Sequence, residues 1–461
     1  MSGPGTDATI ASSFRDPSGS VFLNKGVLCR RVSPSYKEAY DLLMSSGLYR
    51  DLTEAGLMIP HEEVDPGLAQ PGTAYKVLKP HRIPFISYPY EWCFGQLKAA
   101  ALTTLEIQRR ALGYGLSLKD ASAYNIQFIG CRPVLIDTLS FEPYREGEPW
   151  VAYRQFCQHF LAPLALMGLT DIRLGRLSSL YIDGIPLDLA GRLLPLTSRF
   201  SPSLLMHIHL HAGFQSRFAG RAAEKGRGRM GRAQMLGLID SLKSGVNALV
   251  WRGRRTEWSA YYGEMNYTSA AFGEKKRIVA GFLDMAGPKT VWDLGSNTGV
   301  FSRMAAEKGA EVISFDLDPS CVGENYSACL KGGMIKVLPL VMDLANPSPA
   351  IGWEHAERAS LIERGPAGAA LALALVHHLA IGNNVPLERI ELFLSRICRS
   401  LIIEFIPKSD PQVKRLLASR EDIFPEYTQE SFEKAFGKHF EIRNAAGIKG
   451  TERTVYLMSA R

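Results

Sequence analysis

The sequence lacks any segment hydrophobic enough to carry the chain into or across a membrane. Residues 1–14 are rich in glycine, serine and threonine, and no basic segment leads there into an apolar one, so we expect no secretory signal. The longest apolar stretches, 160–169 and 369–376, are far shorter than the roughly 20 residues of a spanning helix. We therefore predict a cytoplasmic protein with no membrane span.

Cysteine is also scarce, and its spacing excludes two common uses. The 461 residues contain seven cysteines, an odd number, and no Cys-x-x-Cys pair. This pattern provides neither a disulfide framework nor a zinc knuckle, and it favours reduced thiols in a cytoplasmic protein. The formal net charge of +7 favours an anionic partner without identifying one.

The length exceeds what one hydrophobic core usually holds, and the composition divides the chain. We predict an N-terminal domain over 1–213, a connection over 214–257 and a C-terminal domain over 258–461. The connection alternates basic residues with glycine and alanine, which indicates either a solvated linker or a contact for a polyanion. Its basic residues include Arg217, Arg221, Lys225, Arg227, Arg229, Arg232, Arg252, Arg254 and Arg255.

The C-terminal domain opens with the first unit of a nucleotide-binding α/β fold. A buried-strand pattern at 290–292 leads into a turn, a helix follows, and a second strand at 311–315 ends at Asp316. The two glycines of the turn let the backbone approach a ligand, and an acid about twenty residues later accepts both ribose hydroxyls. The turn comprises Asp293, Leu294, Gly295, Ser296, Asn297, Thr298 and Gly299.

The glycine spacing argues against a dinucleotide. A pyrophosphate-binding turn has Gly-x-Gly-x-x-Gly, whereas here the three positions hold Gly295, Asn297 and Val300. An acid at Asp293 suits a ligand that carries an ammonium group. This half of the chain resembles the class I S-adenosylmethionine-dependent methyltransferases, whose first motif is acid-x-Gly-x-x-x-Gly. The resemblance implies a Rossmann-like, mostly parallel seven-stranded sheet and S-adenosylmethionine as the cofactor.

The same resemblance implies the residues of the cofactor site and the place of catalysis. A third strand, 336–342, ends at Asp343, where the family has an acid near the adenine amino group. The implied cofactor-binding residues are Asp293, Gly295, Ser296, Asn297, Thr298, Gly299, Asp316 and Asp343. The fourth strand, 369–376, runs into His377 and His378, and the fifth ends at Glu404. These three side chains are our candidates for deprotonating an oxygen or nitrogen nucleophile, with a structural role under the cofactor as the alternative for the histidines.

The N-terminal domain carries a second motif. An amphipathic helix over 94–112 precedes Asp120 and Asn125, and two short apolar strands then lead to Asp137. This arrangement resembles the kinase-like phosphotransferases, especially the aminoglycoside and choline kinase group, and implies an α+β kinase-like domain. The resemblance implies Asp120 as the base and Asn125 and Asp137 as magnesium ligands, with ATP as the nucleotide.

The N-terminal sequence departs from that family at several points. Leu118 stands where kinases usually have a histidine, and Thr138-Leu139 replaces Phe-Gly after the metal-binding aspartate. No Val-Ala-x-Lys strand is present, which leaves Arg30, Arg31 and Lys76 as candidates for the cation that holds the phosphates. Catalysis by this domain is therefore less well supported than its fold.

We predict a methyltransferase whose kinase-like domain assists the binding of substrate or nucleotide. One alternative is a bifunctional enzyme that transfers both phosphoryl and methyl groups, for example to a glycan. A second alternative is a protein that only senses ligands. The sequence leaves the methyl acceptor open between a glycan, RNA, a protein and a small molecule.

Overall fold

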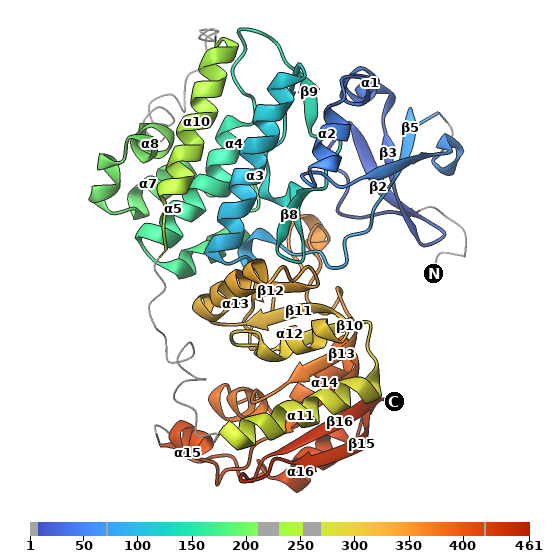
Figure 1. Ribbon diagram of the computed structural model, residues 1–461, viewed down its shortest axis with the longest axis vertical. Coiled ribbons are helices and arrows are strands. Elements are labelled where there is room, and N and C mark those ends of the chain that lie inside the picture. The colour runs from blue at the N-terminus through green and yellow to red at the C-terminus, as the bar shows by residue number, and fades with distance from the viewer. Residues whose placement is uncertain (1–7, 71, 211–229, 252–268, 419–420) are drawn as a thin grey trace. The chain divides into compact units, whose positions relative to one another are not determined.

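The computed structural model describes residues 8–70, 72–210, 230–251, 269–418 and 421–461, which belong to two compact units (Figure 1). The first unit comprises Met1–Arg252 together with Ile351–Arg358, and the second comprises Gly253–Ala350 and Ala359–Arg461. The short insertion is held within the first unit by Glu357, whose carboxylate forms two hydrogen bonds of 2.7 and 2.8 Å with the guanidinium of Arg15.

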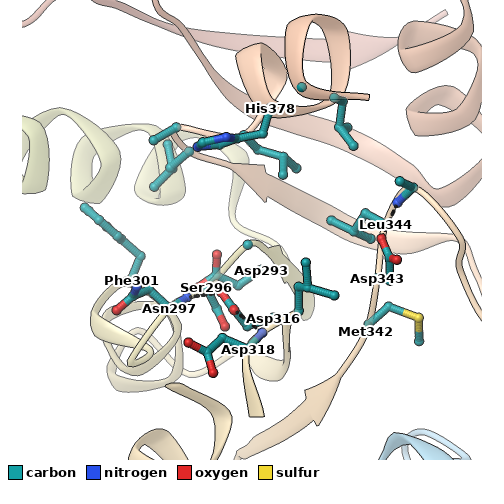
Figure 2. Close-up of a pocket in the computed structure, with 18 of the residues that line it drawn as sticks. Asp293, Ser296, Asn297, Phe301, Asp316, Asp318, Met342, Asp343, Leu344 and His378 are labelled. Atoms are coloured by element: carbon teal, nitrogen blue, oxygen red, sulfur yellow. Dashed lines mark hydrogen bonds between the residues drawn. The ribbon is translucent and has the colours of Figure 1, made fainter. Parts of the chain in front are cut away.

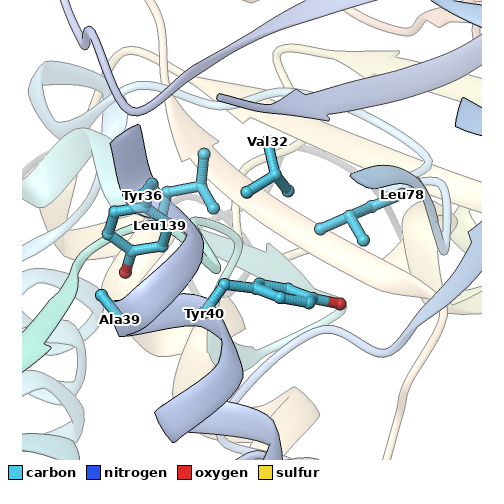
Figure 3. Packing of buried hydrophobic residues seen from close by; sticks show 6 residues of the cluster. All are labelled: Val32, Tyr36, Ala39, Tyr40, Leu78 and Leu139. Carbon is cyan, nitrogen blue, oxygen red and sulfur yellow. The ribbon is translucent and has the colours of Figure 1, made fainter. Parts of the chain in front are cut away.

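The first unit begins with a five-stranded antiparallel sheet in the order β1-β2-β3-β5-β4. The strands are β1 (Ala8–Thr9), β2 (Gly19–Asn24), β3 (Val27–Val32), β4 (His61–Val64) and β5 (Lys76–Pro80). Helices α1 (Lys37–Ser45) and α2 (Leu48–Glu54) connect β3 to β4. Buried side chains join the sheet, α1 and the loop after Asp137 into one core: Val32, Tyr36, Ala39, Tyr40, Leu78 and Leu139 (Figure 3).

The rest of the first unit is mainly helical. The predicted amphipathic helix is α3 (Phe94–Gly113), whose stripe of Leu97, Ala101, Leu105 and Leu112 is buried as expected. The two predicted strands form a hairpin of β7 (Ile126–Ile129) and β8 (Arg132–Leu135), and β6 (Leu116–Leu118) pairs with β9 (Phe141–Pro143). The helices that follow are α4 (Tyr153–Phe156), α5 (Ala162–Leu169), α6 (Leu177–Leu180), α7 (Leu187–Leu193) and α8 (Pro202–Leu204).

Part of the predicted connection is a packed helix, which corrects that prediction. Helix α10 (Arg232–Ala248) lies inside the range 214–257 and packs against α3. Its apolar residues recur at helical spacing and are buried, so the glycine- and charge-based argument overlooked the period that fixes this segment. The buried residues are Met235, Ile239, Leu242 and Val246. The basic residues at 217–229 and 252–255 lie outside the described residues.

The second unit is built on a seven-stranded sheet in the order β12-β11-β10-β13-β14-β16-β15. The first five of these strands are parallel, and β16 and β15 are antiparallel to their neighbours. This confirms the predicted mostly parallel seven-stranded sheet, and its two antiparallel strands lie together at one edge. The bounds are β10 (Thr290–Leu294), β11 (Glu311–Asp316), β12 (Val337–Val341), β13 (Ala367–Ala372), β14 (Cys398–Phe405), β15 (Phe440–Gly447) and β16 (Thr454–Ala460).

The strand order determines where a ligand can bind. From β10 the chain passes to β11 and β12 on one side, and then crosses to β13 and β14 on the other. The carboxyl ends of β10 and β13 therefore meet at the point where the order reverses, which is where open α/β sheets bind their ligands. The helices are α11 (Ser269–Ala286), α12 (Val300–Glu307), α13 (Pro319–Lys331), α14 (Leu387–Ile397), α15 (Pro411–Leu417) and α16 (Gln429–Phe436).

One strand is shorter than its sequence suggests. The apolar run over 369–376 was expected to be all strand, but β13 ends at Ala372. The backbone then turns, and Ala374 takes a φ of +52°, a conformation that costs a residue with a side chain about 1 kcal/mol or more. The apolar residues after Ala372 consequently leave the sheet and form part of a cavity wall.

Candidate functional site

A cavity of about 270 Å³ lies at the carboxyl ends of the parallel strands of the second unit (Figure 2). The loops after β10, β11, β12 and β13 and one side of α11 form its walls. The cavity brings together seven of the predicted site residues: Asp293, Gly295, Ser296, Asn297, Asp316, Asp343 and His378. Thr298, Gly299, His377 and Glu404 do not line it.

The turn after β10 holds its shape through unusual backbone angles. Gly295, Asn297 and Gly299 have φ values of +75°, +51° and +76°. A side chain at Gly299 would also collide with Asn325, so this position needs glycine for two reasons. The backbone N–H groups of Gly295 and Ser296 both donate to the carbonyl oxygen of Phe315 at 2.9 Å. Thr298 and Gly299 therefore shape the turn, whereas the residues before them face the cavity.

Asp316, at the tip of β11, is held in place by the backbone around it. Its two carboxylate oxygens accept the N–H groups of Asn297 at 2.7 Å and Asp318 at 2.9 Å (Figure 2). Burial raises the pKa of Asp316 to about 6, although these N–H groups favour the charged form. A ligand that donates hydroxyl groups to this carboxylate would favour its ionised form. The arrangement suits a ribose.

Asp293 occupies the floor of the same cavity. It is almost fully buried, and the hydroxyl of Ser302 donates to its carboxylate at 2.5 Å. Burial raises the pKa of Asp293 to about 7, and the neighbouring charge of Asp316 adds to the effect. An ammonium group at this end of the cavity would compensate the buried carboxylate.

The polar atoms of the cavity fit S-adenosylmethionine. The hydroxyl of Ser296 is buried and has no hydrogen-bond partner among the described residues, so it is available to a ligand. Leu317, Met342 and Leu344 provide an apolar wall for a flat ring, and Asp343 lies at the end of β12 beside them. Hydroxyl, ammonium and aromatic groups on one ligand would thus each meet a suitable partner.

A chain of four buried charges that the sequence did not reveal leads from the cavity wall into the interior of the second unit. Lys275 on α11 lines the cavity, and its ammonium lies 2.7 Å from Glu404. The other oxygen of Glu404 lies 3.6 Å from Arg453, which makes two hydrogen bonds of 2.7 and 3.0 Å with Asp410. Asp410 in turn caps α15 by accepting the N–H of Gln412. The chain has no net charge, which makes its burial feasible.

This chain changes the place expected for Glu404. We predicted its carboxylate at the edge of the crevice, but the structure places it between Lys275 and Arg453, fully buried. The helix carrying Lys275 explains the difference, because it covers the end of β14. Lys275 has a sequence signal, since it shares one helical face with the buried residues Ala271, Ile278, Val279 and Phe282.

The two histidines have different surroundings. His378 lines the cavity, and burial lowers its pKa to about 4, so its imidazole is neutral at pH 7. His377 is buried behind it, with ring centroids 4.1 Å apart, and burial lowers its pKa well below the usual value. Neither ring nitrogen of His377 has a hydrogen-bond partner among the described residues. Of the three candidate bases, only His378 is placed to meet a ligand.

The motif residues of the first unit lie in a cluster of charges. The guanidinium of Arg30 on β3 lies 2.6 Å from Asp137, and the ammonium of Lys119 lies 2.5 Å from the hydroxyl of Ser18. Lys76, another candidate cation, instead pairs with Glu63 on the neighbouring strand β4. Arg30 is therefore the candidate that faces the predicted metal-binding aspartate.

The loop with the remaining motif residues is shaped by local hydrogen bonds. Asp120 accepts the N–H of Ser122 at 2.9 Å, and the amide of Asn125 donates to the hydroxyl of Ser140 at 3.2 Å. Tyr124 belongs to the same loop, and the guanidinium of Arg358, from the insertion at 351–358, lies 4.2 Å from the centre of its ring. In the part of the chain that the structure describes, no three His, Cys, Asp or Glu side chains are arranged to hold a metal ion.

Comparison with known proteins identifies a relative that matches along nearly the whole chain. The chain is 38% identical over 457 residues to the nodulation protein NoeA of Rhizobium meliloti (strain 1021), covering 97% of this chain and 95% of that protein. No protein-family model matches. In the described residues, no helix has the length and apolar character needed to cross a membrane.

Several solved structures are similar to part of the chain. The crystal structure of WbdD matches at 16% identity over 43% of this chain and 42% of its own, with a TM-score of 0.32. The magnesium protoporphyrin IX methyltransferase ChlM from Synechocystis PCC 6803 matches at 18% identity over 44% and 93%, with a TM-score of 0.32. The N-methyltransferase NodS from Bradyrhizobium japonicum WM9 matches at 9% identity over 42% and 97%, also with a TM-score of 0.32.

Proposed function

This chain belongs to the family of the nodulation protein NoeA, and we propose that it transfers a methyl group from S-adenosylmethionine to an oxygen or nitrogen nucleophile. The observation that carries the proposal is the cavity at the switch point of the seven-stranded sheet, where Asp316 and the unpartnered hydroxyl of Ser296 meet. The methyltransferase domain would span 258–461.

Different residues of the cavity would contact different parts of the cofactor. Asp316 would accept the ribose hydroxyls, and Asp343 would lie near the adenine amino group. Ser296 and Asp293 would hold the amino acid end, with Lys275 as the one lysine or arginine among the described residues that line the cavity. Each assignment matches a donor to an acceptor or a charge to its opposite.

Methyl transfer requires mainly that the nucleophile is positioned correctly relative to the methyl group. S-adenosylmethionine, when bound, supplies a methyl group already activated by the positive sulfur. The chain's part is to exclude water and to orient the nucleophile, which the apolar loop after β13, with Leu373, Ala374 and Leu375, supports. A neutral imidazole at His378 can accept a hydrogen bond from a hydroxyl or amine acceptor and orient it, whereas the burial that lowers its pKa to about 4 makes it a weak base. Glu404 would serve to hold Lys275 rather than to move a proton.

The first unit supports a more limited proposal. Its spacing of Asp120, Asn125 and Asp137 favours a kinase-like domain over 1–213 that helps to bind substrate or nucleotide. Asp137 and Asn125 are suitable ligands for magnesium by residue type. However, a carboxylate oxygen of Asp137 already meets Arg30 and the N–H of Leu139. For this reason we derive no phosphoryl-transfer step, and the bifunctional enzyme and the ligand sensor remain the alternatives.

Titration calorimetry tests the central proposal. The purified protein should bind S-adenosylmethionine or its demethylated product, and Asp316→Ala should weaken binding by roughly ten- to hundredfold, because a charged hydrogen-bonding group is lost. Asp422→Ala is the matched control, since Asp422 is exposed, pairs with Lys408 and accepts the N–H of Phe424 in its own loop. Tight binding of NAD with no binding of S-adenosylmethionine would refute the proposal.

The acceptor needs a different experiment. Methyl-labelled S-adenosylmethionine is added with the protein to fractionated cell extract, and the label is followed into glycan, RNA, protein and small-molecule fractions. Label retained in one fraction identifies the acceptor class. The Asp316→Ala protein serves as the negative control.

A further inference from the structure

The insertion Ile351–Arg358 interrupts the second unit in sequence and folds as part of the first. It closes on itself, because Ile351 and Arg358 each donate their backbone N–H to the carbonyl oxygen of the other at 3.1 Å. A side chain at Gly352 would collide with Glu357, so the turn inside the insertion needs glycine. The insertion therefore has a defined internal structure.

Two contacts attach the insertion to loops of the first unit. The buried carboxylate of Glu357 accepts both hydrogen bonds of Arg15, which precedes the turn into β2. The guanidinium of Arg358 packs on the ring of Tyr124, which lies in the loop 120–125 with the kinase-like motif residues. We call 120–125 the motif loop. A bidentate ion pair is directional and a cation–π contact adds to it, so the place of the insertion depends on these loops.

The chain just before the insertion forms a wall of the cofactor cavity. Met342, Asp343 and Leu344 line the cavity directly after β12 (Figure 2). The N–H of Ser348 donates to the sulfur of Met342 at 3.4 Å, and its carbonyl oxygen accepts the N–H of Leu361 at 3.0 Å. Ser348 thus joins the cavity wall to the chain that returns from the insertion.

The segment between the cavity wall and the insertion is short and stiff. Ala345 lines the cavity and Ile351 begins the insertion, so only 346–350 lie between them. Pro347 and Pro349 fix two of the φ angles in this segment. A short segment with fixed angles passes a displacement from one end to the other, whereas a long flexible linker would absorb it.

We propose that Glu357 and Arg358 are positioning residues through which the motif loop and the cofactor cavity affect each other. This inference rests on the proposed binding of S-adenosylmethionine. A cofactor packed against Leu344 fixes the loop after β12, and the insertion then holds Arg15 and Tyr124 in one arrangement. Such coupling is reciprocal, so a ligand that orders the motif loop raises cofactor affinity by the same factor.

Hydrogen exchange followed by mass spectrometry tests the coupling in the full chain. The probe is S-adenosylhomocysteine, the demethylated product of the cofactor. Exchange is followed in peptides that cover the turn 293–299, the insertion 351–358 and the motif loop. We expect the saturating probe to slow exchange in all three, by about fivefold or more in the insertion and the motif loop.

Three variants interrupt the proposed route at different points. Arg15→Met and Arg358→Met each remove one contact of the insertion. Pro347→Gly with Pro349→Gly leaves both contacts in place and loosens the segment before them. In each variant the turn 293–299 should stay protected, while the response of the motif loop should fall to about half or less. A purely structural role of the insertion would not make this response depend on the two prolines.

Calorimetry with the same probe provides a second readout. Arg15→Met should weaken binding about fivefold, although Arg15 does not line the cavity, because the coupling is lost. Arg110→Met is the matched control, since Arg110 belongs to the same unit and pairs with Asp51 and Glu106, outside the insertion. It should leave affinity and exchange unchanged. Unchanged thermal unfolding confirms that the variants fold.

The outcomes separate this inference from the proposed function. Protection of 293–299 without any change in the motif loop would leave cofactor binding standing and refute the coupling. A motif-loop response that all three variants retain would also refute it, because the response would then be transmitted by another route. No protection in either segment would refute the proposed function together with this inference.

Discussion

The ammonium of Lys275 lies 2.7 Å from the carboxylate of Glu404; both side chains are buried, and Lys275 lines the cavity. The pair joins α11, which precedes β10 in the chain, to the end of β14. Arg453 lies on the other side of Glu404, so protonation of this carboxylate would remove the negative charge that lies between two buried cations. Glu404 is thus suited to hold Lys275 at the cavity and poorly suited to take a proton from an acceptor.

We predict that Glu404→Gln mainly lowers stability. Removing one member of a buried ion pair typically costs about 3–5 kcal/mol, because the other charge stays buried. Chemical denaturation measures the free energy of unfolding, and Lys275→Met should show a comparable loss. Arg443→Gln removes an exposed pair with Glu441 and serves as the control, with a loss below about 1 kcal/mol. A Glu404→Gln protein of normal stability but at least hundredfold slower turnover would instead make Glu404 the base.

The pH dependence of cofactor binding provides a second prediction. The pKa of Asp316 is raised to about 6, and ribose hydroxyls bind its ionised form. Affinity for S-adenosylmethionine should therefore rise between about pH 5 and pH 7, and binding near pH 6 should release protons. Calorimetry in two buffers of different ionisation heat measures this release, and Asp316→Asn should remove the component near pH 6. A pH-independent affinity in the wild type would contradict the assignment.

The same shifts predict how the ligand-free protein responds to pH. Asp293 and Asp316 have pKa values of about 7 and 6 in the folded chain, against about 4 in an unfolded one. Folding thus favours their protonated forms, so their contribution to stability is full below about pH 4 and is lost as the pH rises through 6 to 7. S-adenosylmethionine should offset this loss, which thermal unfolding at several pH values would show.

The sequence predicted the second unit more fully than the first. The strand ends and the acids at 293, 316 and 343 follow from local patterns, because each parallel strand is a short apolar run that stops at a polar residue. The early end of β13 and the burial of Glu404 could not be predicted from local sequence patterns, because both depend on how α11 and the loop after Ala372 pack. Helix α10 was missed for the opposite reason: its apolar period was present, but glycine and arginine nearby suggested a linker.

Gly299 allows a sharp test of the turn. Gly299→Ala should destabilise the protein and abolish cofactor binding, because the new side chain meets Asn325 and also occupies a positive φ. Gly309→Ala is the matched control, with a φ of +98° and nothing within 4 Å of the added atom. This control should lower the free energy of unfolding only because an alanine is disfavoured at positive φ, by about 1 kcal/mol or somewhat more. Equal losses of stability in the two variants would mean that the collision with Asn325 is relieved.

The first unit makes the last prediction, which concerns nucleotide binding. If the domain binds ATP, it should do so only with magnesium, and Asp137→Asn should abolish binding because a metal-binding carboxylate is lost. Arg30→Met should weaken it as well, since Arg30 is the cation that faces Asp137 at 2.6 Å. Lys76→Met is the matched control and should leave binding unchanged, because Lys76 pairs with Glu63 on the neighbouring strand.

Calorimetry with ATP, in the presence of magnesium or of EDTA, separates the outcomes. Loss of binding in both Asp137→Asn and Arg30→Met, with Lys76→Met unchanged, would place the phosphates at the Arg30–Asp137 pair. Binding that persists in EDTA and in Asp137→Asn would place the nucleotide elsewhere and make the motif spacing a coincidence. Loss in Lys76→Met alone would mean that Lys76 leaves Glu63 when the ligand binds, and that Arg30 serves only to neutralise Asp137.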